Sequence, residues 1–220
     1  MEKTIYANID RIRKKIPSST LLVAVSKQAS VAEIRAAYDA GVRDFAENRL
    51  QNALLKQEQL QDLTDIRWHF IGHIQTKKAK KIAENFSWIH SVDSLKLAQK
   101  LNSVTVDMLS TPQVCLQVKV LPDPNKYGWS PSELLEDLAS LDSLEYLKIC
   151  GLMAILPWGL SSAENLAAFK SVQSLAEQIK QQKCSRIRME ELSMGMSGDY
   201  ELAIQAGATM IRPGTTIFQQ

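Results

Sequence analysis

The chain has 220 residues, of which 45% are hydrophobic and 23% are charged, a composition typical of a globular protein with a substantial core. Its net charge is only +2, which excludes binding to nucleic acid or anionic lipid through overall charge. The longest apolar runs, 21–25 and 151–156, are too short to cross a bilayer, so we expect no membrane association.

The sequence begins with an amphipathic helix and continues as an alternation of strands and helices. Isoleucines recur every three or four residues from Ile5 to Ile16, which is the spacing of one helix face. Short apolar or β-rich runs follow it, each bounded by turn or helix-start residues. We predict strands at Leu21–Ser26, Asp44–Glu47, Arg67–Ile71, Trp88–Val92, Val114–Val120, Leu147–Ile155, Arg188–Leu192 and Thr209–Arg212.

Sequence patterns typical of helix N-termini follow these strands directly. Ser30, Ser130 and Ser161 each have a glutamate three residues later, the pattern of a capping box, and residues 48–51 carry a weaker version. Eight strand–helix units predict an α/β fold, a (β/α)8 TIM-like barrel with an extra N-terminal helix. A doubly wound open sheet is the alternative. Only eight residues follow Arg212, too few for a full eighth helix, so we expect the leading helix to cover that side.

Residues 1–220 are expected to form one domain, because no linker, low-complexity tract or repeat interrupts them. Cys115, Cys150 and Cys184 are odd in number and widely spaced, so neither a disulfide framework nor a zinc site is predicted. A reducing, cytoplasmic setting fits this cysteine usage best.

Lys27 stands at the end of the first predicted strand, where barrels of this class collect their functional groups. One interpretation is a lysine that merely extends to solvent. The other is a half-buried reactive amine, and the last two strands decide between them.

Two small-residue segments follow predicted strands seven and eight. The segment 192–199 (LSMGMSGD) contains two glycines and two serines. The segment 211–216 (IRPGTT) contains one glycine and two threonines. Converging backbone N–H groups and hydroxyls bind anions, and barrels often hold phosphate after strands seven and eight. We therefore predict a phosphate site there. Because barrel closure makes strands one and eight neighbours, a phosphate-anchored aldehyde such as pyridoxal 5'-phosphate could form an imine with Lys27.

The chain resembles a known family over nearly its whole length. It is similar to the pyridoxal phosphate homeostasis proteins, single-domain relatives of the N-terminal barrel of bacterial alanine racemase. The segments that carry the resemblance are AVSK (24–27), FAENRLQN (45–52), WHFIGHIQTKK (68–78), GLMAI (151–155), LSMGMSGD (192–199) and RPGT (212–215).

The resemblance implies a set of cofactor-binding residues. Lys27 would carry the Schiff base, Asn48 would lie near the ring, and Arg212 would face the pyridine nitrogen and keep it unprotonated. The phosphate would be surrounded by Ser193, Ser197, Gly214 and Thr215.

Three positions depart from the usual family pattern. Ala46 replaces a glycine, Pro213 replaces an aliphatic residue, and Gln219 stands where glycine often follows the phenylalanine. None removes a proposed contact, although Pro213 could slightly change the approach of the Gly214 backbone.

Other polar residues have plainer interpretations. His69 and His73 do not share a face where a strand passes into a loop, so no metal site is predicted, and His90 is expected to be structural. His73 is placed at the pocket rim by resemblance alone. Lys126 is either an exposed surface lysine or a secondary aldehyde-accepting lysine. The basic segment 76–81 lacks stacking aromatics, so no nucleic-acid partner is expected.

Three functions remain open. We favour a carrier of pyridoxal phosphate in vitamin B6 and amino-acid/keto-acid homeostasis, a monomer whose partners are apoenzymes that accept the cofactor, and not an enzyme. A racemase or related enzyme is the alternative. It needs a second acid/base group, and neither Tyr127 nor Tyr200 lies in a motif that implies proton transfer. The related racemase takes this group from a C-terminal β domain, which we do not expect after Gln220. A phosphate-sugar enzyme would need paired carboxylates, for which only Glu47 and Asp93 are candidates.

Overall fold

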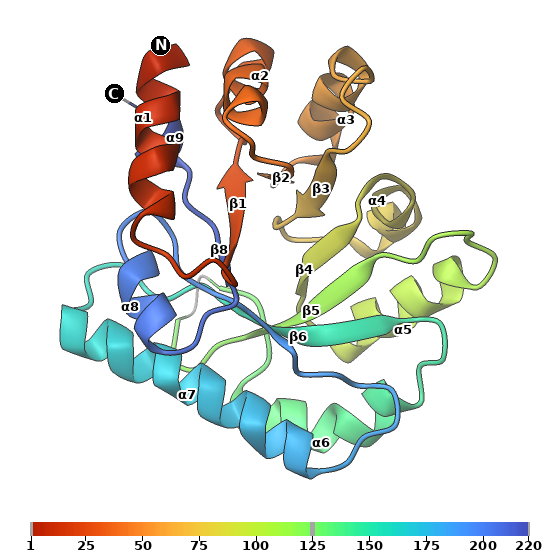
Figure 1. Cartoon of the computed structure of the whole chain (residues 1–220). Coiled ribbons are helices and arrows are strands. Elements are labelled where there is room, and N and C mark those ends of the chain that lie inside the picture. The colour runs from red at the N-terminus through yellow and green to blue at the C-terminus, as the bar shows by residue number, and fades with distance from the viewer. Residues whose placement is uncertain (1, 124–125, 220) are drawn as a thin grey trace.

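Eight parallel strands close into a barrel in the computed structural model, which describes residues 2–123 and 126–219. Strand β8 pairs with β1 through Met210 opposite Leu21 and Ile211 opposite Leu22, so the sheet has no open edge. The predicted barrel is therefore confirmed, and the open sheet is wrong (Figure 1). The strands are β1 (Leu21–Val25), β2 (Asp44–Glu47), β3 (Arg67–Phe70), β4 (Trp88–Val92), β5 (Gln113–Val118), β6 (Lys148–Ala154), β7 (Glu191–Ser193) and β8 (Met210–Ile211).

Helices surround the strands, and three of them begin at the predicted capping boxes. Ser30, Ser130 and Ser161 each accept from the backbone N–H three residues on, while the glutamate there accepts from the serine N–H. The weaker signal at 48–51 forms no box, because α3 begins after Arg49, which makes no side-chain cap. The helices are α1 (Glu2–Arg13), α2 (Val31–Asp39), α3 (Leu50–Gln59), the short 3-10 helix η1 (Thr76–Lys78), α4 (Ala79–Asn85), α5 (Leu95–Thr105), α6 (Pro131–Asp142), α7 (Ser162–Gln181), α8 (Tyr200–Gln205) and α9 (Thr215–Phe218).

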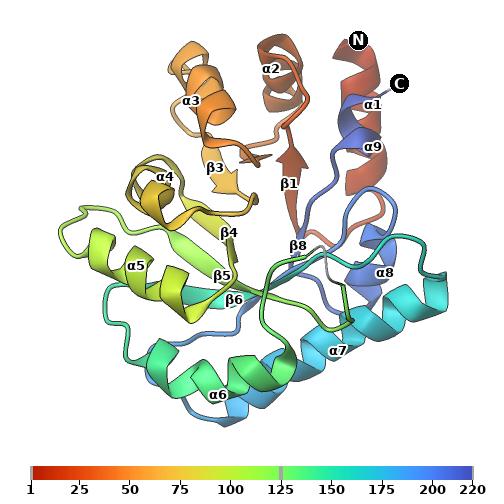
Figure 2. The same cartoon turned by 180° about the vertical axis from the view of Figure 1, so that it is seen from behind.

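The N-terminal helix completes the outer layer as predicted. Helices α1 and α9 lie side by side in both views (Figures 1 and 2), and the Asn8 side chain donates to the carbonyl of Ile217 at 3.1 Å. Helix α9 spans only four residues, so α1 covers the side that a full eighth helix would occupy. No helix within residues 2–123 and 126–219 combines the length and apolarity that a membrane span requires.

Strand β7 differs most from its predicted position. It covers Glu191–Ser193 rather than 188–192, because the chain before it runs beside β6 with only alternate hydrogen bonds, from Arg188 N–H to the carbonyl of Ile149 and from Glu190 N–H to that of Cys150. The two strands approach closely at Gly151, where a Cβ atom would lie 1.8 Å from the carbonyl oxygen of Glu191. Glycine is thus required at the point where β6 and β7 meet.

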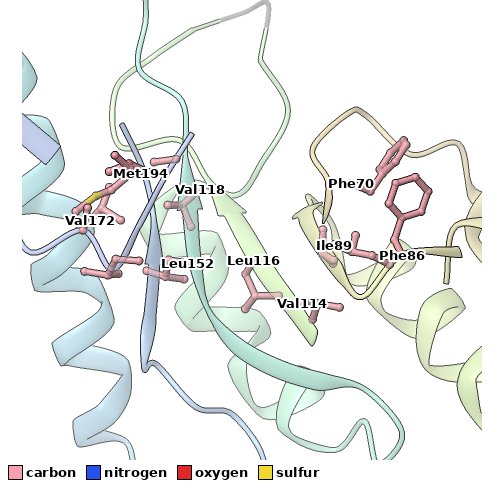
Figure 3. Close-up of a cluster of buried hydrophobic side chains, with 14 of the residues drawn as sticks. Phe70, Phe86, Ile89, Val114, Leu116, Val118, Leu152, Val172 and Met194 are labelled. Carbon is pink, nitrogen blue, oxygen red and sulfur yellow. The ribbon is translucent and has the colours of Figure 1, made fainter. Parts of the chain in front are cut away.

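The larger hydrophobic core lies between the strands and the helices. Outward-facing strand residues such as Leu116 and Leu152 pack beneath α6 and α7, together with Val172 of α7 (Figure 3). Phe70 and Phe86 meet edge to face at 5.0 Å between their ring centroids. This layer buries most of the apolar surface and holds the strands in register.

The interior of the barrel is smaller and mixed in character. Alternate residues of each strand face inward, and the apolar ones form a compact cluster that includes Val23, Val25, Ala46, Cys115 and Met153. The remaining inward positions carry fully buried polar side chains, namely Asp44, His69, His90, Ser193 and Arg212.

Candidate functional site

A cavity of about 830 Å³ opens at the C-terminal ends of β1, β6, β7 and β8. It is within the size range of small-molecule sites. Of the seven predicted cofactor-binding residues, five line it: Lys27, Ser197, Arg212, Gly214 and Thr215. The strand ends that the sequence singled out therefore do meet in one place.

Lys27 follows strand β1 by two residues and continues its inward alternation after Val23 and Val25. It is exposed rather than half-buried as expected. Among the described residues, Lys27 makes no hydrogen bond or ion pair. Its amine is therefore available to a molecule in the cavity.

The loops after β7 and β8 are joined through one hydroxyl group. Ser197 Oγ accepts from the backbone N–H of Gly214 at 3.0 Å and of Thr216 at 3.2 Å. Two N–H groups from one loop thus converge on an oxygen from the other, as in backbone sites that bind anions. Gly195 shapes the first loop, because its φ of +93° and the close approach of Tyr200 exclude a side chain.

Strand β1 lies directly against this pair of loops. The Val25 N–H donates to the carbonyl of Pro213 at 2.9 Å, and a Cβ atom on Gly214 would lie 3.1 Å from the Val25 carbonyl oxygen. Pro213 needs no N–H of its own here, so this departure from the family pattern leaves the contact with β1 intact. Lys27 is consequently held next to the converging N–H groups.

Arg212 lines the cavity from the end of β8, but only 1% of its surface is exposed. Its Nη1 donates to Ser193 Oγ at 2.6 Å and its Nη2 to the carbonyl of Ala154 at 2.9 Å. Burial lowers the pKa of Arg212 to about 10, which still leaves the guanidinium charged at neutral pH. The cavity therefore contains one fixed, buried cation.

Two predicted residues, Asn48 and Ser193, do not line the cavity. Asn48 is half-buried after β2, where its backbone carbonyl packs so closely on Gly72 that a Cβ there would lie 2.1 Å away. Ser193 is fully buried beneath Arg212 and accepts its hydrogen bond. The partners of the Ser193 hydroxyl in this structure are the Arg212 guanidinium and His90.

A buried ion pair holds the strand end that carries Lys27. Lys56 of α3 donates to Glu47 Oε1 and to the backbone carbonyl of Ser26, both at 2.7 Å, and the Ser26 hydroxyl donates to the same Glu47 oxygen. Only 1% of the Glu47 side chain is exposed. Glu47 therefore faces the helix layer and not the cavity, which removes it as a catalytic carboxylate.

A second group of residues lies on the same end of the barrel, away from the cavity lining. His73 Nδ1 contacts Asp93 at 2.9 Å, and its ring stacks on Tyr127 with 3.7 Å between centroids. Asp93 is thus paired with a histidine rather than with Glu47, and the two candidate carboxylates of a phosphate-sugar enzyme do not meet. No histidine or tyrosine is among the described residues that line the cavity.

Lys126 does line the cavity, but its amine is already engaged. It donates to the carbonyls of Ile155, at 3.3 Å, and Leu156, and it lies 3.6 Å from Asp123. Across residues 2–123 and 126–219, no three histidine, cysteine, aspartate or glutamate side chains are arranged so that they could hold one metal ion.

The polar side chains inside the barrel were not predicted as a connected group. Asp44, His69 and His90 each lie in a predicted strand, and their inward alternation is the signal that could have placed them inside. Their contact with one another depends on the register between strands, which the sequence does not give. The hydroxyl of Thr216 beside Ser197 was also not assigned a role.

Comparisons with known proteins agree with this geometry. The sequence profile of the family described as alanine racemase, N-terminal domain, matches residues 2–220. A pyridoxal phosphate homeostasis protein of Synechocystis sp. is 54% identical over 203 residues, which are 92% of this chain and 92% of that protein. A structure of PipY from Synechococcus elongatus PCC7942 with PLP bound has a TM-score of 0.92 at 46% identity, covering 97% of this chain and 99% of that one. Alanine racemase of Clostridium difficile 630 shares the fold, with a TM-score of 0.80 at 14% identity, covering 99% of this chain but 57% of the racemase.

Proposed function

The chain belongs to the alanine racemase N-terminal domain family, and within it to the pyridoxal phosphate homeostasis proteins, and on that premise we propose that it holds pyridoxal 5'-phosphate as a Schiff base on Lys27. One observation carries the proposal. An exposed amine without a partner among the described residues shares a cavity with converging N–H groups and a buried guanidinium.

The chemical groups that line the cavity are of the types that this cofactor needs. When bound, pyridoxal 5'-phosphate supplies an aldehyde that condenses with a primary amine and releases one water. Lys27 is the amine without a competing partner, whereas Lys126 is engaged by two carbonyls. The N–H groups around Ser197, with the hydroxyls there, would hold the phosphate, and Arg212 would face the ring nitrogen. Asn48 lies in the loop after β2 and does not line the cavity, so it would approach the ring from that loop.

We further propose that the whole barrel, residues 1–220, serves as one binding domain with a homeostatic role. It would carry and buffer the cofactor for apoenzymes and so affect amino-acid and keto-acid pools. The name of the Synechocystis relative and the PLP bound to PipY support this role. Cys115, Cys150 and Cys184 are all free thiols, which suits a reducing compartment.

Enzymatic turnover is not part of the proposal. Racemisation needs two acid/base groups on opposite faces of the cofactor. Lys27 could serve one face, but the described cavity lining offers no histidine or tyrosine for the other. Arg212 opposite the ring nitrogen would also weaken the ring as an electron sink. Incubation of the loaded protein with L-alanine should give no D-alanine at the roughly 1–10³ per second of ordinary enzymes.

Borohydride trapping tests the proposal. The protein is incubated with pyridoxal 5'-phosphate, reduced with borohydride, digested and mapped by mass spectrometry. We expect the pyridoxyl group on the peptide that contains Lys27. A label confined to another lysine, or no label at all, would contradict the assignment.

A further inference from the structure

A continuous line of hydrogen-bonded side chains crosses the barrel interior and ends at Arg212. Asp44 Oδ1 contacts His69 Nε2 at 2.9 Å, and His69 Nδ1 contacts His90 Nε2 at 2.8 Å. His90 Nδ1 then contacts Ser193 Oγ at 2.6 Å, and Arg212 Nη1 donates to that same oxygen at 2.6 Å. We call Asp44, His69, His90 and Ser193 the interior chain.

The interior chain is buried along its whole length. Its members and Arg212 are at most 2% exposed, and they come from strands β2, β3, β4 and β7 and the end of β8. At the Asp44 end it meets Arg67, which donates to Asp44 Oδ2 at 2.6 Å and whose side chain is 54% exposed. A buried cation at the cavity is thereby connected to a buried carboxylate near the opposite end of the barrel.

The donors and acceptors allow one ordering of protons when both rings are neutral. A carboxylate only accepts, so His69 Nε2 carries the proton that reaches Asp44. His69 Nδ1 is then bare and accepts from His90 Nε2–H. His90 Nδ1 is bare in turn and accepts from the Ser193 hydroxyl, whose oxygen accepts from Arg212. Every hydrogen bond therefore points from Arg212 toward Asp44.

Hydrogen bonds in the opposite direction, from His69 through His90 to Ser193, would be less favourable for two reasons. They would require His69 to hold a proton on both nitrogens while fully buried. They would also direct His90 Nδ1–H at Ser193 Oγ, which already accepts from Arg212 and whose own hydroxyl proton would have no acceptor among the described residues. The network is satisfied only when both rings stay neutral.

The surroundings favour the neutral rings as well. Burial lowers the pKa of His69 more than the facing Asp44 carboxylate raises it, and Arg67 lowers it further. Burial also lowers the pKa of His90 well below its usual value, and the facing His69 and Arg212 act in the same direction. Trp88, which is not titratable, stacks on His69 with an interplanar angle of 4°.

We propose that the interior chain consists of positioning residues that orient Arg212 and connect it by hydrogen bonds to a buried carboxylate, Asp44, at the far end of the barrel. Ser193 engages Nη1 of the guanidinium and the carbonyl of Ala154 engages Nη2, so the group cannot rotate or withdraw without breaking the chain. A fixed cation beside a bound ring sets the charge state of its nitrogen, a consequence that rests on the proposed function. The chain itself belongs to the protein with or without the cofactor.

Histidine-selective nitrogen-15 NMR tests the chain directly, because the protein contains only three histidines. The full chain is labelled and measured with and without pyridoxal 5'-phosphate between pH 8 and 5.5. Two rings should show a protonated Nε2 and a bare Nδ1 throughout, and assignment by His73→Gln identifies them as His69 and His90. A proton on Nδ1 of either ring, or a doubly protonated ring at pH 7, would overturn the proposal.

Variants of Ser193 test the connection to Arg212. Ser193→Ala should move the His90 Nδ1 resonance and raise the dissociation constant for pyridoxal 5'-phosphate about tenfold, the size of one hydrogen bond to a charged group. Ser193→Thr should restore both. Thr209→Val is the matched control, because Thr209 also links β7 to β8 by its hydroxyl but lies outside the chain. Equal effects of Ser193→Ala and Thr209→Val would show a merely structural role.

The outcomes separate this proposal from the proposed function. If borohydride labels no lysine but the two rings show the expected tautomers without cofactor, the binding function fails and the chain stands. If Lys27 is labelled and the tautomers differ, the chain is wrong and the function stands.

Discussion

Lys27 and Arg212 are two cations that line one cavity from neighbouring strands, and the protein surrounds them in opposite ways. Lys27 is exposed and has no partner among the described residues. Arg212 is buried, donates to Ser193 and to Ala154, and reaches the Asp44 carboxylate through the side chains of Ser193, His90 and His69. The contrast fits the two roles proposed for these residues: the lysine proposed to form a bond is left without partners, and the arginine proposed to face the ring nitrogen is held in place.

The same strand alternation that places both residues inside the barrel makes this division possible. Lys27 extends the inward set of β1 beyond the strand end, where the cavity is open. Arg212 lies two residues after the inward Met210 of β8 and one residue past the strand end, where the interior is closed. The depth at which a cation leaves the barrel therefore decides whether it is exposed or buried.

Removing the reactive amine should have the largest effect. Lys27→Ala should abolish the visible absorption of protein-bound pyridoxal 5'-phosphate, because no other lysine of the cavity is without a partner. Lys27→Arg is the matched variant, since it keeps the positive charge but cannot form an imine. Absorption spectra of the three proteins check this, and a band that survives in Lys27→Arg would refute the assignment.

Removing the carboxylate at the far end of the interior chain should have the next largest effect. Asp44→Asn removes the carboxylate that accepts from His69 and Arg67, and it should lower the free energy of unfolding by about 3–5 kcal/mol, as for a broken buried ion pair. Asp65→Asn is the control, because Asp65 pairs with Arg43 on the surface and its loss should barely move the transition. Urea unfolding of both variants compares them. If the two shift equally, the buried chain does not depend on the Asp44 carboxylate.

Acid should weaken the protein through the two buried histidines. Their pKa values are lower in the folded chain than in the unfolded one, because burial opposes protonation. The stability they contribute is therefore complete above about pH 6.5, the unfolded value, and is lost as the pH falls, by up to about 1.4 kcal/mol per histidine for each pH unit. Urea midpoints at pH 7.5 and 5.5 measure this. His90→Gln should flatten the dependence, and an unchanged slope would contradict the account.

The hydroxyl that joins the two loops should affect phosphate recognition more than ring binding. Ser197 Oγ accepts two N–H bonds and donates to no described residue, so its proton is available to an anion. Ser197→Ala should weaken binding of pyridoxal 5'-phosphate about tenfold or more, the value of one charge-assisted hydrogen bond. Pyridoxal, which lacks the phosphate, is the control ligand and should bind the variant and the parent alike. Titrations that show equal losses for both ligands would place the phosphate elsewhere.

Sequence patterns predicted the parts of this molecule that depend on local order. The isoleucine spacing predicted the leading helix, and the short apolar runs with their capping boxes predicted the eight strands and the position of Lys27 at a strand end. The loops after β7 and β8 were recognisable because their small residues follow strands directly. These features need no knowledge of how distant strands are staggered.

The interior chain could not be predicted in the same way. Ala46 pairs with His69, and His69 pairs with Trp88, so residues at one height occupy different places in successive strands. This stagger accompanies the tilt of strands in a closed barrel. The sequence therefore did not indicate that Ser193 would lie within hydrogen-bond distance of both His90 and Arg212.

The smallest effect is expected at the third cation of the cavity, Lys126. Its ammonium already donates to the carbonyls of Ile155 and Leu156, so it is neither an unpartnered amine like Lys27 nor a buried charge like Arg212. Lys126→Met keeps most of the apolar stem, and a partly exposed ion pair contributes little, so affinity for pyridoxal 5'-phosphate should change by about fivefold at most. Borohydride mapping of the variant should still place the label on Lys27. If the parent protein instead carries a second label on Lys126, and the variant loses it together with cofactor uptake, then carbonyl contacts do not protect an amine here. The contrast between Lys27 and Arg212 would then have to include a second reactive site.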